Sequence, residues 1–326
     1  MQKFIDDMSS DKLLTALESN MAAFWSAYGR GNGCTLQSTP NVVWFYTGIQ
    51  VALLNGVISA KMKYDEVKAT VDSLQSKIDE RGAPALWWLG PQSTPENLGA
   101  LLEQHGLQRA GETPGMAADL AMVNSMTKAI ENFMIEKVSN VEMQALWARI
   151  AAIGTGFSDT ATTEMAQLEA TLTDSQYKAQ HRYIGFLDGA PVATSAMVLD
   201  SGVAGIYAVA TIPEARRKGI GEIMTVMPLL EARQIGYRVG ILQASSMGYP
   251  IYKRIGLKTC VNLISIYNPK RNPDVTAQHS VHPTGGSLRV FKQFSRLRVG
   301  SGKEVLPRPT HQRVTQAVRR TGPGEP

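Results

Sequence analysis

The chain has 326 residues, a length that suits two domains better than one small one. Its composition, 44% hydrophobic and 19% charged, is that of a globular protein and excludes disordered, collagenous and coiled-coil chains. No apolar run approaches the roughly 18 residues of a membrane helix, and the first residues carry no export or transit pattern. We therefore expect a cytoplasmic protein that has no membrane partner. Two cysteines, Cys34 and Cys260, are too few for a disulfide framework.

The net charge of +5 is unevenly placed along the chain. Residues 269–326 hold 11 Lys and Arg against 3 Asp and Glu, which leaves a net charge of −3 on the first 268 residues. Because Pro and Gly are scattered through 269–326 and no helical or strand period is sustained there, we expect a basic, disordered tail. Two hypotheses fit this tail, a solvated extension and a polyanion-binding arm. A nucleic-acid partner is not expected, since it would depend on the tail alone.

Residues 1–130 show the periods of both helices and strands. Apolar residues at helical spacing begin the chain, and two strongly apolar stretches, VVWFYTGI and ALWWLG, are typical of strands. The predicted elements are a helix around 14–24, a strand at 42–49, a helix over 64–81, a buried strand at 85–90 and a helix over 96–105.

Residues 131–268 alternate in the same way. Asp188-Gly189 is the turn between two predicted strands. Strands that alternate with helices of this length predict an α/β protein with a mixed sheet. The predicted elements are a strand at 133–138, helices over 141–152 and 163–172, two strands within 181–199, a strand at 205–211, a helix over 219–234, a strand at 238–244, a short helix ending near 255 and a strand at 261–267.

The two halves of the sequence contain a weak internal repeat. LLEQHGLQRAG at 101–111 resembles IYKRIGLKTCV at 251–261, and the matching Gly-Leu pairs are offset by 150 residues. Each copy follows a helix that itself follows a buried strand. The matched order of elements predicts a duplicated unit.

The segment IYAVATIPEARRKGIGEIM carries the clearest chemical signal. A strand stops at Pro213, which has no N–H for a sheet ladder, and a helix follows Gly219-Ile220-Gly221. Glycines let the backbone approach a ligand, and the first turn of a helix presents unpaired N–H groups to an anion. With Arg216, Arg217 and Lys218 beside that turn, the segment predicts a phosphate or pyrophosphate site.

Two other phosphate loops do not fit. Gly-Ile-Gly-Glu lacks the Lys and hydroxyl of a Walker loop, and Met224 replaces the third glycine of a dinucleotide fingerprint. The run Arg216-Arg217-Lys218-Gly219-Ile220-Gly221 resembles the acyl-CoA loop of the GNAT superfamily of N-acetyltransferases, Arg/Gln-x-x-Gly-x-Gly/Ala after a strand. Downstream, SSMGYPIYKRIGL resembles the second marker of that family. The resemblance covers about 131–268 and implies a tandem GNAT protein, with a catalytic domain at 131–268 and a degenerate GNAT-like domain at 1–130.

The resemblance implies a role for each matching residue. The backbone of Val209, Ala210 and Thr211 would pair with the pantetheine arm of acetyl-CoA like an added strand. The N–H at Val209 or nearby would stabilise the oxyanion formed on attack. The amides of 217–221, with Arg216 as the first residue of the motif, would hold the pyrophosphate. Tyr252 falls on the position of the general acid that protonates the leaving thiolate.

The sequence departs from the family pattern at two positions. Ser245 stands where many members have an Asn that contacts the cofactor, so this contact is weakened or rerouted. Gly205 stands where some members have a Glu base, so the motif shows no base. Glu164, Glu169 and Asp174 lie in the segment that usually covers the acceptor and are the candidate bases, none preferred.

In the first half, the segment ISAKMKYDE, directly upstream of the 64–81 helix, has no Gly-x-Gly, and the offset of 150 puts Leu102 at the position of Tyr252. We expect no cofactor site there. The five histidines form no metal-binding spacing, so no metal is expected. The leading hypothesis is an acetyl-CoA-dependent N-acetyltransferase that transfers the acetyl group directly to a small-molecule or peptide amine. The alternatives are a CoA-binding regulator without turnover and a nucleic-acid-binding protein that acts through its tail. The oligomeric state is not predicted.

Overall fold

The computed structural model describes residues 5, 11–123, 129–172 and 180–270. The tail predicted at 269–326 therefore lies outside the described residues, apart from its first two. None of the described helices is long and apolar enough to cross a membrane.

The first half contains the elements that periodicity predicts, together with an N-terminal helix longer than expected. Its main helix begins where Tyr64–Glu66 forms a turn of 3-10 helix and ends at Gly82, which takes a left-handed φ of 80°. In chain order the elements are α1 (Asp11–Tyr28), β1 (Thr35–Ser38), β2 (Val42–Tyr46), β3 (Asn55–Ala60), α2 (Val67–Arg81), β4 (Leu86–Leu89), α3 (Leu98–Gln104) and β5 (Gln108–Asp119).

After an additional strand and helix at its start, the second half repeats this order of helices and strands. Asp188 and Gly189 both have positive φ, 51° and 77°, as a two-residue hairpin turn requires. In chain order the elements are β6 (Phe133–Lys137), α4 (Val141–Thr155), α5 (Asp159–Ala170), β7 (Gln180–Leu187), β8 (Ala190–Asp200), β9 (Val203–Thr211), α7 (Ile220–Gln234), β10 (Val239–Gln243), α8 (Tyr249–Arg254) and β11 (Lys258–Tyr267).

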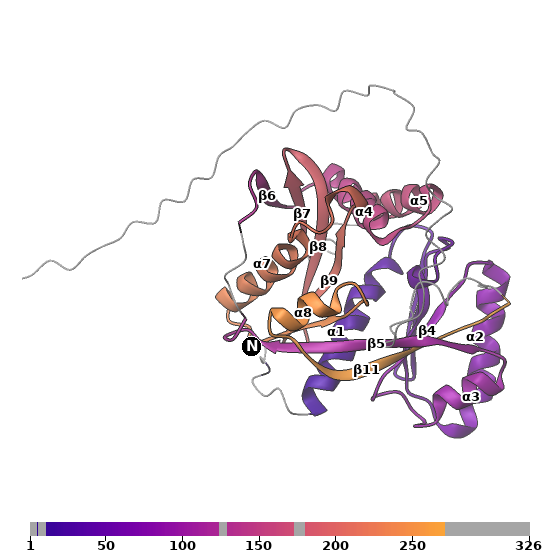
Figure 1. Cartoon of the computed structure of the whole chain (residues 1–326). Helices are drawn as coiled ribbons and strands as arrows, with labels where there is room; N and C mark the ends of the chain where they lie inside the picture. Colours follow the sequence, from indigo (N-terminus) through magenta and orange to yellow (C-terminus); the bar gives the residue numbers. More distant parts are fainter. Residues whose placement is uncertain (1–4, 6–10, 124–128, 173–179, 271–326) are drawn as a thin grey trace, which may run out of the picture. The chain divides into compact units, whose positions relative to one another are not determined.

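All described strands join one mixed sheet of 11 strands, in the order β1-β2-β3-β4-β11-β5-β10-β9-β8-β7-β6. At its centre β5 and β11 run antiparallel, side by side (Figure 1). The last strand of each half pairs with the other half, because β11 lies against β4 and β5 lies against β10. Because of this exchange, the two halves belong to one compact unit. The domain boundary at 130/131 therefore stays a prediction from the sequence.

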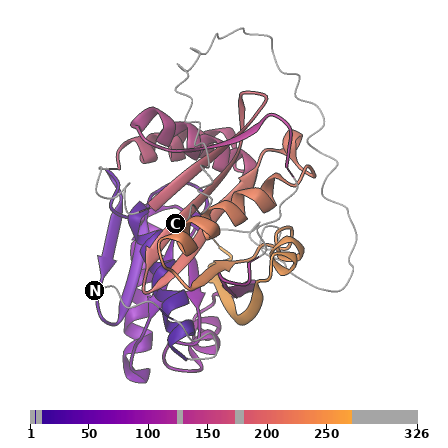
Figure 2. The same cartoon turned by 90° about the vertical axis from the view of Figure 1, so that its left-hand side faces the viewer.

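Alternate strand residues face two different helical layers. In β4, Leu86 and Trp88 pack in the core that contains α1, α4 and α5, whereas Trp87 and Leu89 pack in the core that contains α2 and α3. In the second half, α7 and α8 continue the helical layer that contains α2 and α3. The salmon-coloured helix α7 packs against β8 and β9 (Figure 2). α1 belongs to the first half of the sequence but packs on β8 and β9 of the second. The fold class predicted from the sequence, a mixed α/β sheet in tandem, is confirmed.

Candidate functional site

A fork between β9 and β10 forms the centre of the candidate site. The two strands pair in parallel at only three positions, Ala204–Ile206 with Gly240–Leu242. Beyond Ile206, β9 stays with β8, while β10 follows β5 and the Ala244 N–H donates to the Pro114 carbonyl at 2.8 Å. The residues predicted to pair with a ligand, Val209–Thr211, therefore have a strand neighbour on one side only among the described strands.

A bulge helps β9 to leave β10. The register with β8 shifts between Thr194 and Ala196, and Ala208 takes a left-handed φ of 48° at that place. The Thr194 hydroxyl donates to the Ala208 carbonyl at 2.9 Å, which stabilises the bulge. Bulges bend a strand and are common beside active sites.

The phosphate loop has the geometry that its sequence predicts. Arg217 and Gly219 both take left-handed φ, 64° and 85°, and Gly219 is the N-cap of α7. The N–H groups of Glu222 and Ile223 both donate to the Gly219 carbonyl, whereas the N–H groups of 217–221 have no acceptor within the described residues. Nothing lies within 4 Å of a Cβ placed on Gly221. The turn thus offers free amides, a helix dipole and two exposed cations to an anion.

Arg216 has a different function from its neighbours. Its guanidinium donates to the Thr211 carbonyl at 3.1 Å and to the Gly154 carbonyl at 3.0 Å. The side chain therefore fixes the loop to the end of β9 and to α4, and Arg217 and Lys218 are the exposed cations.

Tyr252 and Ser245 lie on the β10 side of the fork. Both residues line a cavity of about 300 Å³, which Val209 also lines. Burial raises the pKa of Tyr252 to about 12, and the neighbouring Thr225 hydroxyl offsets part of that rise. The Ser245 hydroxyl accepts from the Gly248 N–H at 3.1 Å and so caps the turn into α8.

The cavity continues from the fork to the first half of the chain. Apolar and aromatic side chains of α1 form one wall, the segment around the C-terminal end of α4 forms another, and neither was predicted from the sequence. Charged side chains and histidines are absent from its lining, as far as the described residues go. The lining residues are Met21, Phe24, Trp25, Tyr28, Leu53, Leu54, Trp88, Thr113, Ala151, Thr155, Phe157, Met165, Ile206, Tyr207, Ala208, Val209, Gln243, Ala244, Ser245, Ser246 and Tyr252.

Asn20 of α1 explains why position 205 is a glycine. A Cβ on Gly205 would lie 2.0 Å from Asn20 Oδ1. The buried Asn20 amide donates to the carbonyls of Val198, Asp200 and Val203, at 3.0–3.3 Å, and its Oδ1 accepts from the Tyr207 hydroxyl at 2.7 Å. A side chain of the first half thus occupies the place at which some GNAT proteins would carry a glutamate. The one signal in the sequence was a polar residue inside the apolar stripe of α1.

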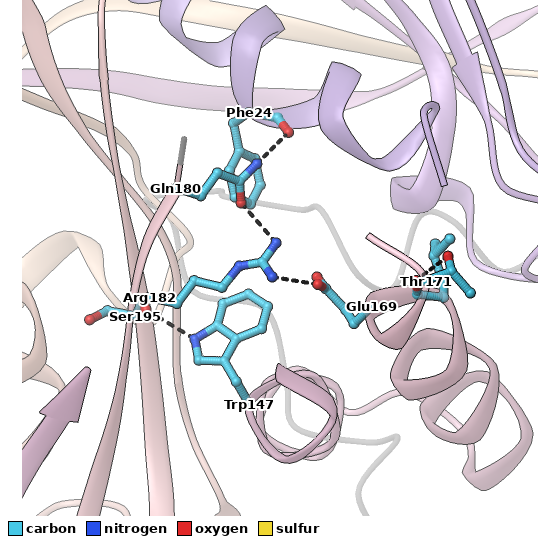
Figure 3. Close-up of polar contacts among 8 residues, drawn as sticks. Phe24, Trp147, Glu169, Thr171, Gln180, Arg182 and Ser195 are labelled. Carbon is cyan, nitrogen blue, oxygen red and sulfur yellow. Dashed lines mark hydrogen bonds and ion pairs between the residues drawn. The ribbon is translucent and has the colours of Figure 1, made fainter. Parts of the chain in front are cut away.

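The candidate bases on α5 do not line the cavity. Glu169 is fully buried and pairs with Arg182, whose guanidinium lies 4.6 Å from the centre of the Trp147 ring and also donates to Gln180 (Figure 3). Burial raises the pKa of Glu169 despite Arg182. Glu164 is half-buried on the same helix and is likewise absent from the lining, and Asp174 lies outside the described residues. Among the described residues, no group of three or more His, Cys, Asp or Glu has the geometry to hold a metal ion.

The equivalent fork in the first half is filled by the chain itself. β3 and β4 pair only at Gly56–Val57 with Leu86–Trp87. Beyond them, the Thr94 N–H donates to the Ala60 carbonyl at 3.0 Å and the Met62 N–H donates to the Thr94 carbonyl at 3.1 Å. Thr94 forms a parallel bridge with Lys61, in the position of an added strand.

Comparison with known proteins gives a fold and no close relative. No family model and no curated protein matches the sequence. A GCN5-related N-acetyltransferase from Kribbella flavida matches with 18% identity and a TM-score of 0.57, over 78% of this chain and 95% of that one. A tandem GNAT protein from the clavulanic acid biosynthesis pathway matches with 9% identity and a TM-score of 0.54, over 80% and 95%. A functionally unknown conserved protein from Staphylococcus epidermidis matches with 13% identity and a TM-score of 0.53, over 74% and 94%.

These identities support a common fold and no more. The similarity to the tandem protein extends over both halves of the chain, and the phosphate loop and the fork lie in the second half. The chain is therefore a protein of the GNAT fold in its tandem form.

Proposed function

We propose that the chain is an acyl-CoA-dependent N-acyltransferase that transfers an acetyl group from acetyl-CoA directly to a primary amine in a ternary complex. The observation that carries this proposal is the continuity of three features: free amides at 217–221, a backbone edge at Val209–Thr211 that has no neighbour among the described strands on the side of β10, and Tyr252 beside the same cavity. An anion-binding turn alone would suit many ligands. A turn followed by an unpaired strand edge suits a pyrophosphate that carries an amide-containing arm.

The residues present fit acetyl-CoA as the donor. The amides of 217–221, with Arg217 and Lys218, hold the pyrophosphate, and Arg216 keeps the loop in place. The β9 edge binds the two amides of the pantetheine arm, whose thioester supplies the activated acyl group. Backbone N–H groups near the bulge at Ala208 stabilise the oxyanion.

Tyr252 acts on the leaving sulfur. A pKa of about 12 keeps its hydroxyl protonated across the physiological range, the state in which it donates to the sulfur. Because position 205 on β9 carries no carboxylate, the amine reaches the cavity neutral or loses its proton to water or to a group on the acceptor side. We propose acceptor binding between α1 and the fork, and no donor binding in the first half, where Thr94 occupies the strand edge.

One observation favours a second candidate, a CoA-binding protein without turnover. The described residues that line the cavity include no carboxylate or histidine to accept a proton. The two candidates make opposite predictions for release of CoA.

The test is release of free CoA from acetyl-CoA in the presence of a panel of amines. The proposal expects amine-dependent thiol release that falls in Tyr252→Phe, with acetyl-CoA affinity retained. Acetyl-CoA binding without release by any amine supports the regulator, and failure to bind acetyl-CoA rejects both.

A further inference from the structure

We propose that the acceptor is a primary aromatic amine, with the nitrogen attached directly to a ring of one or two cycles, which enters the cavity uncharged. This inference rests on the proposed function and adds the class of acceptor. It is based on the side chains of α1 that form one wall of the cavity next to the fork.

The wall is a fixed cluster of rings. The rings of Phe24 and Tyr207 stack with centroids 4.2 Å apart and planes at 7°, and the Trp25 ring meets Phe24 edge-on at 4.8 Å. Tyr28 packs edge-on against Phe24 at 5.7 Å. Phe24, Tyr28 and Tyr207 are all buried, so these rings are held by their neighbours rather than by a ligand. A flat apolar ligand gains contact area and ring stacking against such a wall without ordering it.

The cavity has no counter-charge for an ammonium group. None of its described lining residues is Asp, Glu, Lys, Arg or His, and its polar groups are hydroxyls, amides and backbone. The fully buried charges Glu169 and Arg182, which both interact with Tyr28 of the lining, are paired with each other. A cation taken from water into this space loses hydration that no ion pair restores.

Cation–π contacts to the rings could hold an ammonium, but a protonated amine has no lone pair for attack on the thioester. Among the described lining residues there is no Asp, Glu or His that would accept its proton. Such a cation is therefore an inhibitor of this site and not its acceptor. An amine on an aromatic ring avoids the problem, since delocalisation of its lone pair keeps it neutral at physiological pH.

The volume of about 300 Å³ lies at the small end of ligand pockets. It suits an acceptor of one or two rings and excludes a folded protein segment with several side chains. The adjacent backbone of Val209 places the amine beside the thioester.

The test compares two isomers of equal size, 4-methylaniline and benzylamine, of which only benzylamine is protonated at pH 7. Calorimetry on the full chain saturated with CoA should give 4-methylaniline at least about tenfold tighter binding at pH 7. The apparent affinity of benzylamine should rise about tenfold per pH unit up to its own pKa, while that of 4-methylaniline stays constant. Release of CoA from acetyl-CoA should depend on pH in the same way. It should rise with pH when benzylamine is the acceptor and stay constant when 4-methylaniline is the acceptor.

A charge placed in the cavity should reverse the preference. Phe157 is half-buried in the lining, so Phe157→Glu should improve benzylamine binding at least fivefold relative to Phe157→Gln, which has the same shape. Ile153→Glu adds the same charge at a position 39% exposed and outside the lining, and should leave the preference unchanged.

The outcomes separate this inference from the proposed function. If acetyl-CoA binds, but benzylamine or the polyamine spermidine binds at pH 7 as tightly as 4-methylaniline, the aromatic-amine inference is wrong and the proposed function stands. If acetyl-CoA does not bind, the proposed function is wrong and the inference goes with it.

Discussion

The contact between Asn20 and Gly205 gives the sharpest test of how the two halves cooperate. Gly205→Ala would place a methyl group 2.0 Å from Asn20 Oδ1 and 2.6 Å from the Tyr207 ring, well inside van der Waals contact. Both neighbours are buried and tied by hydrogen bonds, so neither moves freely. Asn20 must leave its position, and the Tyr207 hydroxyl then loses its acceptor.

The cost can be worked out from these contacts. Overpacking in a core costs about 1–3 kcal/mol. A buried hydroxyl left without its partner costs about 1–3 kcal/mol more. We therefore expect Gly205→Ala to lower the free energy of unfolding by roughly 2–6 kcal/mol. Asn20→Ala should cost about 2–4 kcal/mol, because it removes the same hydrogen bonds without a clash.

Urea unfolding of the two single variants and the double variant measures the coupling. Asn20→Ala makes room for the new methyl group, so the double variant should be about as stable as Asn20→Ala alone, a coupling of at least about 2 kcal/mol. Gly221→Ala serves as the control for a glycine replaced in open space, and should be neutral or stabilising by up to about 1 kcal/mol. Additive single costs, or a Gly205→Ala cost below about 1 kcal/mol, would refute the reasoning.

Two further predictions concern Tyr252 and the pair in Figure 3. Tyr252→Phe should lower kcat about 100-fold with little change in acetyl-CoA KM, and a loss below about threefold would assign the residue to packing. Because the folded pKa of about 12 lies above the ordinary 10, the wild-type kcat should not fall as the pH rises from 7 to 10; the stability that this phenol contributes should be lost only between pH 10 and 12. Glu169→Gln should lower the free energy of unfolding by about 3–5 kcal/mol, since it leaves the Arg182 charge buried and uncompensated, and the double variant with Arg182→Met should recover at least half of that loss in chemical denaturation. Equal stability of the single and double variants would contradict a role for the pair in holding α5 to β7.

Local patterns in the sequence were enough for most of the elements and for the loop, but they did not predict β1, β3 and β5. Helical and strand periods predicted α2, β4 and the β7–β8 hairpin with small errors at their ends, because these signals lie within a few residues of one another. The loop at 216–221 was predicted for the same reason: the glycines, the cations and the following helix are contiguous.

The exchange of β5 and β11 could not be read from the sequence. Each strand has the same apolar pattern whichever half it pairs with, and partners more than 100 residues apart leave no local signal. The part of α1 in the cavity was missed for a related reason. Asn20 looked like an irregularity in an apolar helix, and only the fold brings it to Gly205. Thr94 in the first fork was equally invisible, because two of its three bonds to Ala60 and Met62 use the backbone and only the third, from its hydroxyl to the Met62 carbonyl, uses the side chain.

The most direct test of the account is a calorimetric titration of acetyl-CoA into the wild type and two matched variants. Gly221→Glu puts a carboxylate in the open first turn of α7, where it suits the helix dipole but repels a pyrophosphate. Ala69→Glu makes the corresponding change, a carboxylate added at an exposed neutral position in the first turn of α2. We predict one site per chain in the wild type, an affinity loss of at least about 100-fold in Gly221→Glu at unchanged fold stability, and no change in Ala69→Glu. Two sites per chain, or binding that Gly221→Glu leaves intact, would contradict the assignment of the donor site to the second half.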